Sequence, residues 1–338
     1  MRRFLTATAV LLLVAVFALP GCGGGAPSES TGALKVGMVF DVGGKGDKSF
    51  NDSAYRGLLR AADDFSVEHT EFEPGQDADR ETGLRKLAQA GYDVIIGVGF
   101  LFSESIRTVA VDYPDVQFAC VDFDARPGET LPPNLAGLRF REEEGSFLVG
   151  AIAAMTSETG RIGFVGGMDV PLIHRFEAGY IAGAKHVDPS ISITVAYAGS
   201  SPQAFADPAR GKELALLQYG RGVDVIYHAA GSTGLGVIEA AREAGRYAIG
   251  VDSNQNYVAP GTVLTSMVKR VDNAVYAAIL EAYNDEFRGG VHEFGLAEDG
   301  VAYAVDDYNS ELITDEMVER VEEAKAGIIA GEISVPRE

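Results

Sequence analysis

The chain has 338 residues, of which 46% are hydrophobic and 23% are charged. This length exceeds what one compact core usually serves, and the apolar content is too high for an unfolded polypeptide, so a two-domain or two-lobed protein is expected. The 49 acidic residues outnumber the 28 basic ones and give a net charge of −21, which argues against nucleic acid, anionic lipid or any other polyanion as the main partner.

The beginning of the chain has the pattern of an export signal. A positively charged start precedes an apolar run over residues 4–19, which is shorter than the ~20 residues that a membrane-spanning helix needs. The run ends in Leu-Pro-Gly-Cys22, which resembles the bacterial lipobox, although Pro20 stands where a small residue is usual. We expect residues 1–21 to be a lipoprotein signal peptide, Cys22 to be the lipidated residue and residues 22–33 to be a flexible tether. An ordinary signal peptide, cut nearby, is the alternative.

Cys120 is the other cysteine of the chain. If Cys22 carries lipid, the exported protein cannot form an internal disulfide, and its core must hold the fold unaided. Cys120 lies in the apolar run 116–121, which is typical of a small buried side chain and not of a nucleophile.

From residue 34 onward, short apolar runs alternate with amphipathic stretches of helical length. This alternation predicts an α/β protein with parallel sheets. The expected strands are residues 35–40, 94–98, 116–121, 162–165, 191–196, 223–227, 247–251 and 301–305, and residues 263–268 form one further apolar run. The expected helices are residues 53–65, 82–90, 103–113, 143–156, 176–186, 209–219, 235–244, 272–287 and 314–330.

The pattern contains more parallel strands than one open sheet usually holds, and it restarts near residue 160. Two doubly wound parallel-sheet lobes account for both features. We expect residues 34–138 plus 258–290 to form the N-terminal lobe and residues 139–257 plus 291–338 to form the C-terminal lobe. Because open parallel sheets bind ligands at the carboxyl ends of their strands, two facing lobes predict a ligand cleft between them.

A glycine-rich loop over residues 41–52 follows the first expected strand. A phosphate-binding loop would need Gly-Lys-Ser or Gly-Lys-Thr where this loop has Asp-Lys-Ser, and its aspartates would oppose phosphate. Asn51 or Asp52 can cap the following helix. Capping leaves Phe50, placed beside Asp41 and the other acids of the loop, without a role, so these residues are candidates for ligand binding.

Other chemically distinctive residues also lie at the ends of expected strands or the beginnings of helices. Asp122 and Asp252 each follow a strand, Lys269 ends an apolar run, and Phe176 lies at the beginning of a helix. Gly231 opens a Gly-x-x-Gly-x-Gly segment, which differs from the dinucleotide-binding spacing and instead suggests close backbone approach to a ligand. Carboxylates, an amide, a lysine and aromatic rings together suit a small, uncharged, hydroxyl-rich and partly aromatic ligand, such as a ribonucleoside.

With these motifs, the chain resembles the basic membrane protein family of lipoproteins, the substrate-binding components of ABC importers that include bacterial purine nucleoside receptors. The resemblance spans residues 34–338 and is carried by the segment Asp-x-Gly-Gly-x-Gly-Asp-Lys-Ser-Phe-Asn at residues 41–51, together with residues 228–236 and 250–255. It implies the fold of type I periplasmic binding proteins, with two α/β lobes joined by three hinge strands and the ligand closed between them.

The resemblance implies roles for the residues on the nucleobase side of the cleft. Asp41 and Asn51 would hydrogen-bond the base, and Phe50 would stack on one of its faces. A second aromatic ring would cover the other face; Phe176 is the first candidate and Phe205 is its competitor.

On the ribose side, the resemblance implies that Asp122, Asp252 and Lys269 bind hydroxyl groups and that Gly231 presents its backbone. A buried carboxylate without a partner is costly, so we expect Asp252 to be matched by ligand hydroxyls and by Lys269. Deoxynucleosides should therefore bind more weakly, and Asp41 and the ribose-side carboxylates should repel nucleotides.

The expected function is that of an extracytoplasmic, lipid-anchored nucleoside-binding protein. It would close on adenosine, guanosine or inosine and deliver the ligand to the permease and ATPase of an ABC importer, with no cofactor, no metal, no nucleic acid partner and no catalysis. The five histidines are scattered without metal-ligand spacing, and the chain has no Gly-x-Ser-x-Gly motif. A sugar-binding importer component and a lipid-anchored receptor or adhesin are the alternatives; Asp41 with Asn51 fits a base edge better than a sugar.

Overall fold

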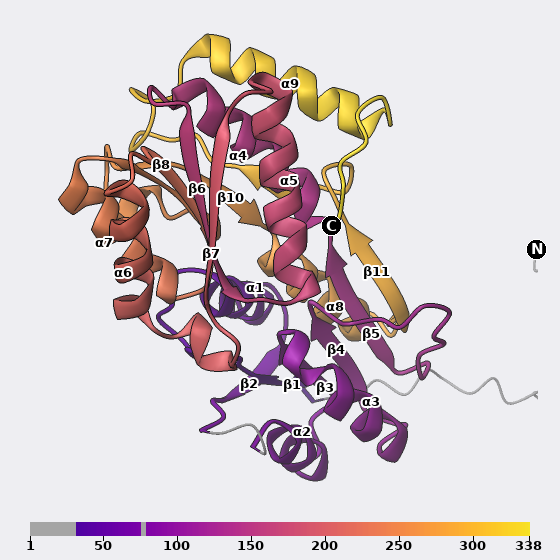
Figure 1. Ribbon diagram of the computed structural model, residues 1–338. Coiled ribbons are helices and arrows are strands. Elements are labelled where there is room, and N and C mark those ends of the chain that lie inside the picture. Colours follow the sequence, from indigo (N-terminus) through magenta and orange to yellow (C-terminus); the bar gives the residue numbers. More distant parts are fainter. Residues whose placement is uncertain (1–31, 76–78) are drawn as a thin grey trace, which may run out of the picture. The chain divides into compact units, whose positions relative to one another are not determined.

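The computed structural model describes residues 32–75 and 79–338. The expected signal peptide, Cys22 and nearly all of the expected tether lie outside these residues. Residues Ala33–Glu338 form one compact unit, which contains two six-stranded sheets (Figure 1). Among the described residues, none of the helices combines the length and the apolar character that crossing a bilayer requires.

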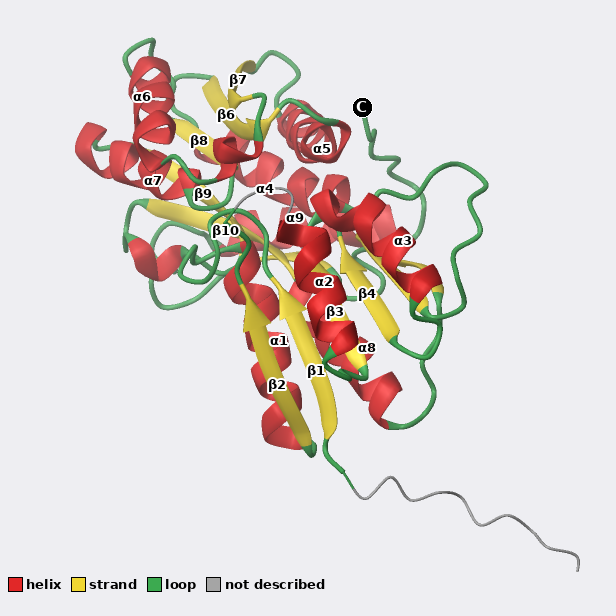
Figure 2. Cartoon of the chain, turned by 90° about the horizontal axis from the view of Figure 1, so that it is seen from below, coloured by secondary structure: helices red, strands yellow, loops and turns green. Residues whose placement is uncertain are grey.

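The first sheet belongs to the N-terminal lobe, and all of its strand pairs are parallel. Its strands lie in the order β11 (Gly290–Phe294), β5 (Leu135–Phe140), β4 (Gln117–Val121), β3 (Val94–Val98), β1 (Leu34–Val39) and β2 (Val67–Phe72). Figure 2 shows α2 (Asp79–Gln89) and α3 (Ser103–Asp112) on one face of this sheet, with α1 (Phe50–Asp64) and α8 (Val271–Tyr283) on the other.

Alternation along β1 explains why this sheet is covered on both faces. Val36 and Met38 pack in one apolar cluster with Leu58 of α1, whereas Val39 points to the other side and packs in a second cluster with Leu84 of α2. A strand buried on both faces needs apolar residues at successive positions, which is why it reads as a nearly continuous hydrophobic run.

The second sheet belongs to the C-terminal lobe. Its strands lie in the order β12 (Val301–Tyr303), β10 (Val263–Lys269), β9 (Tyr247–Asp252), β8 (Val225–Ala229), β6 (Arg161–Met168) and β7 (Ser192–Gly199). Only β12 is antiparallel to its neighbour in the described part of this sheet. The helices of this lobe are α4 (Glu142–Thr156), α5 (Pro171–Val187), α6 (Pro208–Tyr219), α7 (Thr233–Ala244) and α9 (Asp315–Ile329).

The two faces of the second sheet are covered by different helix pairs. Tyr227 of β8 packs in the cluster that contains Phe147 of α4, while its neighbour Ile226 packs with Leu214 of α6 and Val237 of α7. In both lobes, therefore, helices cover both faces of a parallel sheet. This architecture confirms the fold class expected from the sequence.

Helices α4 and α5 pack unusually closely, and glycines make this possible. A Cβ atom at Gly183 would lie 1.9 Å from the backbone oxygen of Phe147, and one at Gly179 would lie 2.1 Å from the backbone oxygen of Glu143. Any larger residue would push the helices apart. The close contact holds the first turns of α4, which begins at Glu142, against α5, which carries Phe176.

Three strands, β2, β5 and β11, are not apparent in the sequence pattern. β2 and β11 lie at the two edges of the first sheet, and β2 has exposed side chains at alternate positions. An edge strand of this kind lacks the apolar run that marks a buried strand.

The chain passes between the lobes at three places, from β5 to α4, from β10 to α8 and from β11 to β12. Hydrogen bonds tie these crossings to their neighbours: the backbone N–H of Arg141 donates to the oxygen of Phe294 at 3.0 Å, and that of Arg270 donates to the oxygen of Gly300 at 2.8 Å. The three crossings are thus joined into one narrow region.

The lobe boundaries differ from the expected ones. Strand β10 pairs with β9 in the second sheet, whereas β11 pairs with β5 in the first, so the expected N-terminal segment 258–290 is divided between the lobes. The expected boundary between residues 138 and 139 falls inside β5. The position of a strand in the sequence does not reveal its lobe, because the chain moves to the other lobe at each of the three crossings.

Candidate ligand-binding site

A cavity lies between the lobes, at the carboxyl ends of their parallel strands. All eight binding residues expected from the sequence line it: Asp41, Phe50, Asn51, Asp122, Phe176, Gly231, Asp252 and Lys269. Its other lining residues are Val42, Asp47, Phe100, Leu172, Ile173, Phe205, Ala229, Ala230 and Val251. The structure therefore brings the expected residues together from strand ends that are far apart in sequence.

Asp47 organises the loop that follows β1. Its carboxylate accepts hydrogen bonds from the backbone N–H groups of Ser49 at 2.8 Å, Asn51 at 2.8 Å and Asp52 at 3.1 Å. These groups lie at the beginning of α1, where backbone donors lack partners within the helix. The capping role expected of Asn51 or Asp52 thus falls to Asp47.

Asn51 is 2% exposed and holds the same loop from inside. Its Oδ1 accepts a hydrogen bond from the backbone N–H of Asp41 at 3.0 Å, and its Nδ2 donates to Oδ2 of Asp47 at 3.1 Å. Its Nδ2 also donates to the backbone oxygen of Val42 at 3.4 Å, so one lone pair of the amide oxygen remains for a ligand. Asn51 accordingly combines a loop-forming role with its position in the cavity.

Asp41 follows β1, and its side chain is 10% exposed. Its Oδ1 accepts from the backbone N–H of Val42 at 2.8 Å and lies 3.8 Å from a guanidinium nitrogen of Arg80. A Cβ atom at Gly99, whose φ is +109°, would lie 2.2 Å from Oδ2 of Asp41. The absence of a side chain at Gly99 therefore gives the carboxylate of Asp41 the space it occupies. Neither Gly99 nor Arg80 could be identified as a neighbour of Asp41 from the sequence motif.

Lys269 is the centre of the polar side of the cavity. Its Nζ lies 2.7 and 2.9 Å from the two carboxylate oxygens of Asp122, 3.7 Å from Glu142 and 3.8 Å from Asp252. Lys269 is 1% exposed and Glu142 is fully buried. The ammonium thus hydrogen-bonds Asp122 and forms longer ion pairs with Glu142 and Asp252. The expected pairing of Asp252 with Lys269 is therefore present, and Asp252 also receives a hydrogen bond from the hydroxyl of Ser49 at 2.7 Å.

Burial governs the electrostatics of this cluster. It raises the pKa of Asp252 to about 6, although Lys269 and Ser49 act in the opposite direction. It likewise raises the pKa of Glu142 to about 7, opposed by Arg175 and Lys269. Burial disfavours the charge on Lys269, but the surrounding carboxylates outweigh burial and raise its pKa above the ordinary value. Lys269 is therefore charged at neutral pH, and its neighbours Asp252 and Glu142 bind protons more readily than exposed carboxylates.

Aromatic rings also line the cavity, and two of them lie close to Lys269. The Nζ atom of Lys269 lies 4.8 Å from the ring centre of Phe50 and 5.3 Å from that of Phe176. The rings of Phe100 and Phe205 meet edge to face at 6.4 Å. Both candidates for the second stacking ring thus line the cavity. Phe100, which follows β3, was not expected from the sequence.

Three lining residues have left-handed backbone conformations. The φ angles of Asp122, Asp252 and Gly231 are +56°, +63° and +54°. Such conformations are uncommon for residues other than glycine and are most tolerable for aspartate and asparagine. Sharp turns at these strand ends direct the side chains of both aspartates into the cavity.

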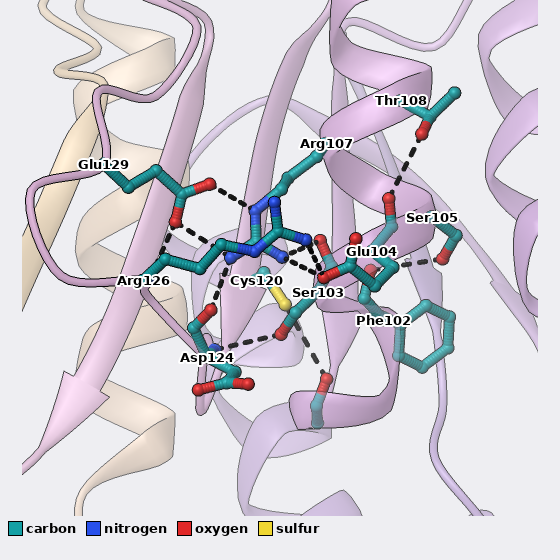
Figure 3. A network of polar contacts seen from close by, with 11 residues as sticks. Phe102, Ser103, Glu104, Ser105, Arg107, Thr108, Cys120, Asp124, Arg126 and Glu129 are labelled. Atoms are coloured by element: carbon teal, nitrogen blue, oxygen red, sulfur yellow. Dashed lines mark hydrogen bonds and ion pairs between the residues drawn. The ribbon is translucent and has the colours of Figure 1, made fainter.

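A polar network fixes the loop that begins at Asp122 (Figure 3). The guanidinium of Arg107 donates to both carboxylate oxygens of Glu129 at 2.5 and 2.9 Å and to the backbone oxygen of Asp124. The hydroxyl of Ser103 accepts from the backbone N–H of Asp124 at 2.9 Å. These contacts anchor the chain two residues beyond Asp122, and so hold that carboxylate against Lys269.

The buried carboxylates predict an unusual pH dependence of stability. The folded-state pKa of Asp41 is about 7, and those of Glu142 and Asp252 are about 7 and 6, all raised mainly by burial above the value near 4 of an unfolded chain. Because these groups bind protons more tightly when folded, the free energy of unfolding should fall as the pH rises from 6 to 8. Urea unfolding at pH 6, 7 and 8 measures this slope.

His228 opposes that trend in acid. Burial lowers its pKa to about 4, so its contribution to stability is lost as the pH falls from about 6.5 to 4. One histidine offsets only part of the effect of three carboxylates, so we expect the rise in stability to be less steep below pH 6, and we expect a shallower slope between pH 6 and 8 in Asp41→Asn. A free energy of unfolding that is constant or higher at pH 8 would contradict this prediction.

Known proteins resemble this chain over nearly its whole length. Residues 34–338 match the family described as ABC transporter substrate-binding protein, PnrA-like. Basic membrane protein A of Borreliella burgdorferi is 37% identical, with 89% of this chain and 87% of that protein covered. The ABC transporter nucleoside-binding protein BmpA of Lactococcus lactis is 32% identical, with 99% of each chain covered.

A solved structure and a further relative extend this result. A solute-binding protein of an ABC transporter system from Aeropyrum pernix has a TM-score of 0.81 and 33% identity, and the match covers 90% of this chain and 94% of that one. An uncharacterized lipoprotein of Pyrococcus abyssi is 37% identical, with 90% of this chain and 77% of that protein covered. On the strength of the family match and of these relatives, the chain belongs to the PnrA-like family of ABC transporter substrate-binding proteins.

Proposed function

We propose that this protein is an extracytoplasmic receptor for purine nucleosides, anchored to the membrane by lipid on Cys22. It delivers its ligand to the permease and ATPase of an ABC importer by closing two lobes around it. The observation that carries the proposal is one cavity, lined from both lobes, that combines carboxylates, a buried lysine and aromatic rings.

The polar side of the cavity suits a ribose. Asp122 and Asp252 offer acceptors for the hydroxyl protons of a sugar, and Lys269 supplies a donor between them. Each of the three is less than a tenth exposed, so hydrogen bonds to a ligand would replace few bonds to water. Charged hydrogen bonds of this kind are stronger than those between neutral groups.

The aromatic side suits a flat heterocycle. Phe50 from the first lobe and Phe176 and Phe205 from the second line the same cavity, and one of the latter two would cover the other face of the base. Aromatic side chains that stack on a base contribute about 1–3 kcal/mol each. Asp41, beside Phe50 at the same strand end, supplies an acceptor for the N–H groups at the edge of a base, a feature that a simple sugar lacks.

The names of two relatives support the proposal. The Lactococcus relative is called a nucleoside-binding protein, and the Pyrococcus relative is called a lipoprotein. The latter agrees with the Leu-x-Gly-Cys ending of the apolar run at the beginning of this chain.

Calorimetric titration of ligand-free protein with inosine, guanosine and adenosine tests the proposed function. We expect one site per chain for at least one of them, and intact nucleoside after prolonged incubation, as a receptor requires. The same titration with ribose and glucose is the control. Binding of the sugars without binding of any nucleoside, or release of free base, would contradict the proposal.

A further inference from the structure

Two loops from opposite lobes are hydrogen-bonded directly to each other beside the cavity. The hydroxyl of Ser253 donates to the backbone oxygen of Ser49 at 2.7 Å, and the side chain of Gln255 donates to the backbone oxygen of Lys48 at 3.1 Å. In the opposite direction, the hydroxyl of Ser49 lies 2.7 Å from Oδ2 of Asp252. We call these three contacts the interlobe clasp.

Ser49 differs from the other members of the clasp because its partner lines the cavity. Ser49 is fully buried, and its Oγ lies 3.1 Å from the backbone oxygen of Val251 as well as 2.7 Å from Asp252. A serine has one hydroxyl proton to donate. The charged carboxylate oxygen is both nearer and a stronger acceptor than the backbone oxygen, so the proton is donated to Asp252. The bond therefore fixes one oxygen of Asp252 from the opposite lobe.

Asp252 has few other groups to hold it. Its second oxygen lies 3.8 Å from Nζ of Lys269, which hydrogen-bonds Asp122 instead. Its backbone has a φ of +63°, so a sharp turn directs the side chain but does not fix its rotation. Ser49 supplies the short hydrogen bond that does, and Ser49 belongs to the other lobe.

We infer that Ser49 is a positioning residue, which orients Asp252 for ligand hydroxyls only when the lobes are together. Recognition of a hydroxyl group and closure of the cleft are then one coupled event, because separation of the lobes removes the donor that orients the carboxylate. The inference rests on the proposed function, in which Asp252 binds a ribose hydroxyl.

The chain offers two matched serine controls. The hydroxyl of Ser253 bonds the backbone oxygen of Ser49 and accepts from Arg56 at 3.0 Å, but does not bond Asp252. Ser253→Ala therefore removes interlobe hydrogen bonds without removing one from the carboxylate. Ser53, one turn of α1 beyond Ser49, is buried, and its hydroxyl has no hydrogen-bond partner among the described residues. Ser53→Ala therefore removes a buried hydroxyl that takes part neither in the interlobe clasp nor in the orientation of Asp252.

The experiment measures affinities of the wild type and the three alanine variants for adenosine, 2′-deoxyadenosine and 3′-deoxyadenosine. Loss of a hydrogen bond to a charged group corresponds to an about 10- to 100-fold loss of affinity, which is the expected effect of Ser49→Ala on adenosine. The deoxyadenosine that lacks the hydroxyl bound by Asp252 should lose less affinity in Ser49→Ala than adenosine does. The ratio of the adenosine affinity to the affinity for that analogue should therefore fall. Ser253→Ala should weaken all ligands by one common factor, and Ser53→Ala should change neither affinity nor ratio.

Retention of the wild-type ratio by Ser49→Ala would overturn the inference, whether affinity is unchanged or falls equally for all three ligands. In the second case, Ser49 would act only as part of the clasp. Failure of the proposed function is distinguishable, because the wild-type protein would then bind none of these nucleosides.

Discussion

Lys269→Met is expected to lower the free energy of unfolding by about 3–5 kcal/mol at pH 7.5, as removal of one partner from a buried ion pair typically does. The variant leaves Asp122 without the ammonium that lies 2.7 Å from it, and leaves Glu142 and Asp252 without a cation at 3.7 and 3.8 Å. Methionine retains the length of the side chain, so lost packing contributes little. Urea unfolding of the two proteins gives the difference.

The same variant should regain stability in acid. Without Lys269, the pKa values of Glu142 and Asp252 rise further above those of the unfolded chain. Their unfavourable contribution therefore grows as the pH rises and disappears as they bind protons. The difference between wild type and Lys269→Met should therefore shrink between pH 8 and pH 5.

Lys212→Met is the matched control. Lys212 pairs with Glu239 at 3.0 Å and Glu243 at 2.8 Å, but its side chain is 31% exposed and those of its partners are more than half exposed. Exposed pairs contribute little to stability because solvent and salt screen them, so this variant should stay near wild type at every pH. Equal losses in both variants would refute the central role of Lys269.

Removal of a ribose hydroxyl from the ligand should have the largest effect on binding. A site built to hydrogen-bond a hydroxyl can discriminate against an analogue that lacks it by up to ~10⁴- to 10⁵-fold, because the buried polar groups lose their partner. Asp122, Asp252 and Lys269 form such a set, since each is less than a tenth exposed. We expect adenosine to bind far more tightly than 2′-deoxyadenosine or 3′-deoxyadenosine in calorimetric titrations.

AMP extends this series. It retains both hydroxyls but adds negative charge to a cavity that contains Asp41, Asp122 and Asp252, so it should also bind more weakly than adenosine. The AMP affinity should recover partly in high salt, whereas those of the deoxynucleosides should not, because added ions screen charge and do not replace a hydroxyl. Equal affinities for adenosine, its deoxy analogues and AMP would overturn the proposed ribose contacts.

The sequence was most informative where strand order and chemistry coincide. Asp41, Asp122 and Asp252 follow or end strongly apolar strands, and parallel strands place their carboxyl ends at one edge, so proximity could be predicted without knowing any contact. The same reasoning reached Lys269 and Phe50. The pairing of Lys269 with Asp122 could not be reached in this way, because it depends on how one lobe faces the other.

Glu142 shows what the sequence conceals. It begins a run of three glutamates at the beginning of α4, a pattern ordinarily typical of an exposed helix terminus. The structure buries it completely, 3.7 Å from Lys269 and 3.4 Å from Arg175, because the chain passes between the lobes at this point. A position at a lobe crossing leaves no local signal in the sequence.

The backbone role of Asp47 and the position of Phe100 in the cavity were missed for a different reason. Asp47 lies in the same motif as Phe50 but serves the backbone of α1, and such a role is chemically indistinguishable from ligand binding in a sequence. Phe100 follows β3 within a short helical turn, η1 (Phe100–Phe102), and an apolar residue beside a strand gives no sign that it faces a cavity.

Small-angle scattering of ligand-free protein during titration with inosine tests the central claim most directly, because that claim joins nucleoside binding to closure of the two lobes. A ligand that bridges both lobes stabilises the closed state over the open one, so the radius of gyration should fall and saturate at one inosine per chain. A radius that stays constant at saturating inosine, or that falls with ribose but not with the nucleoside, would contradict the account.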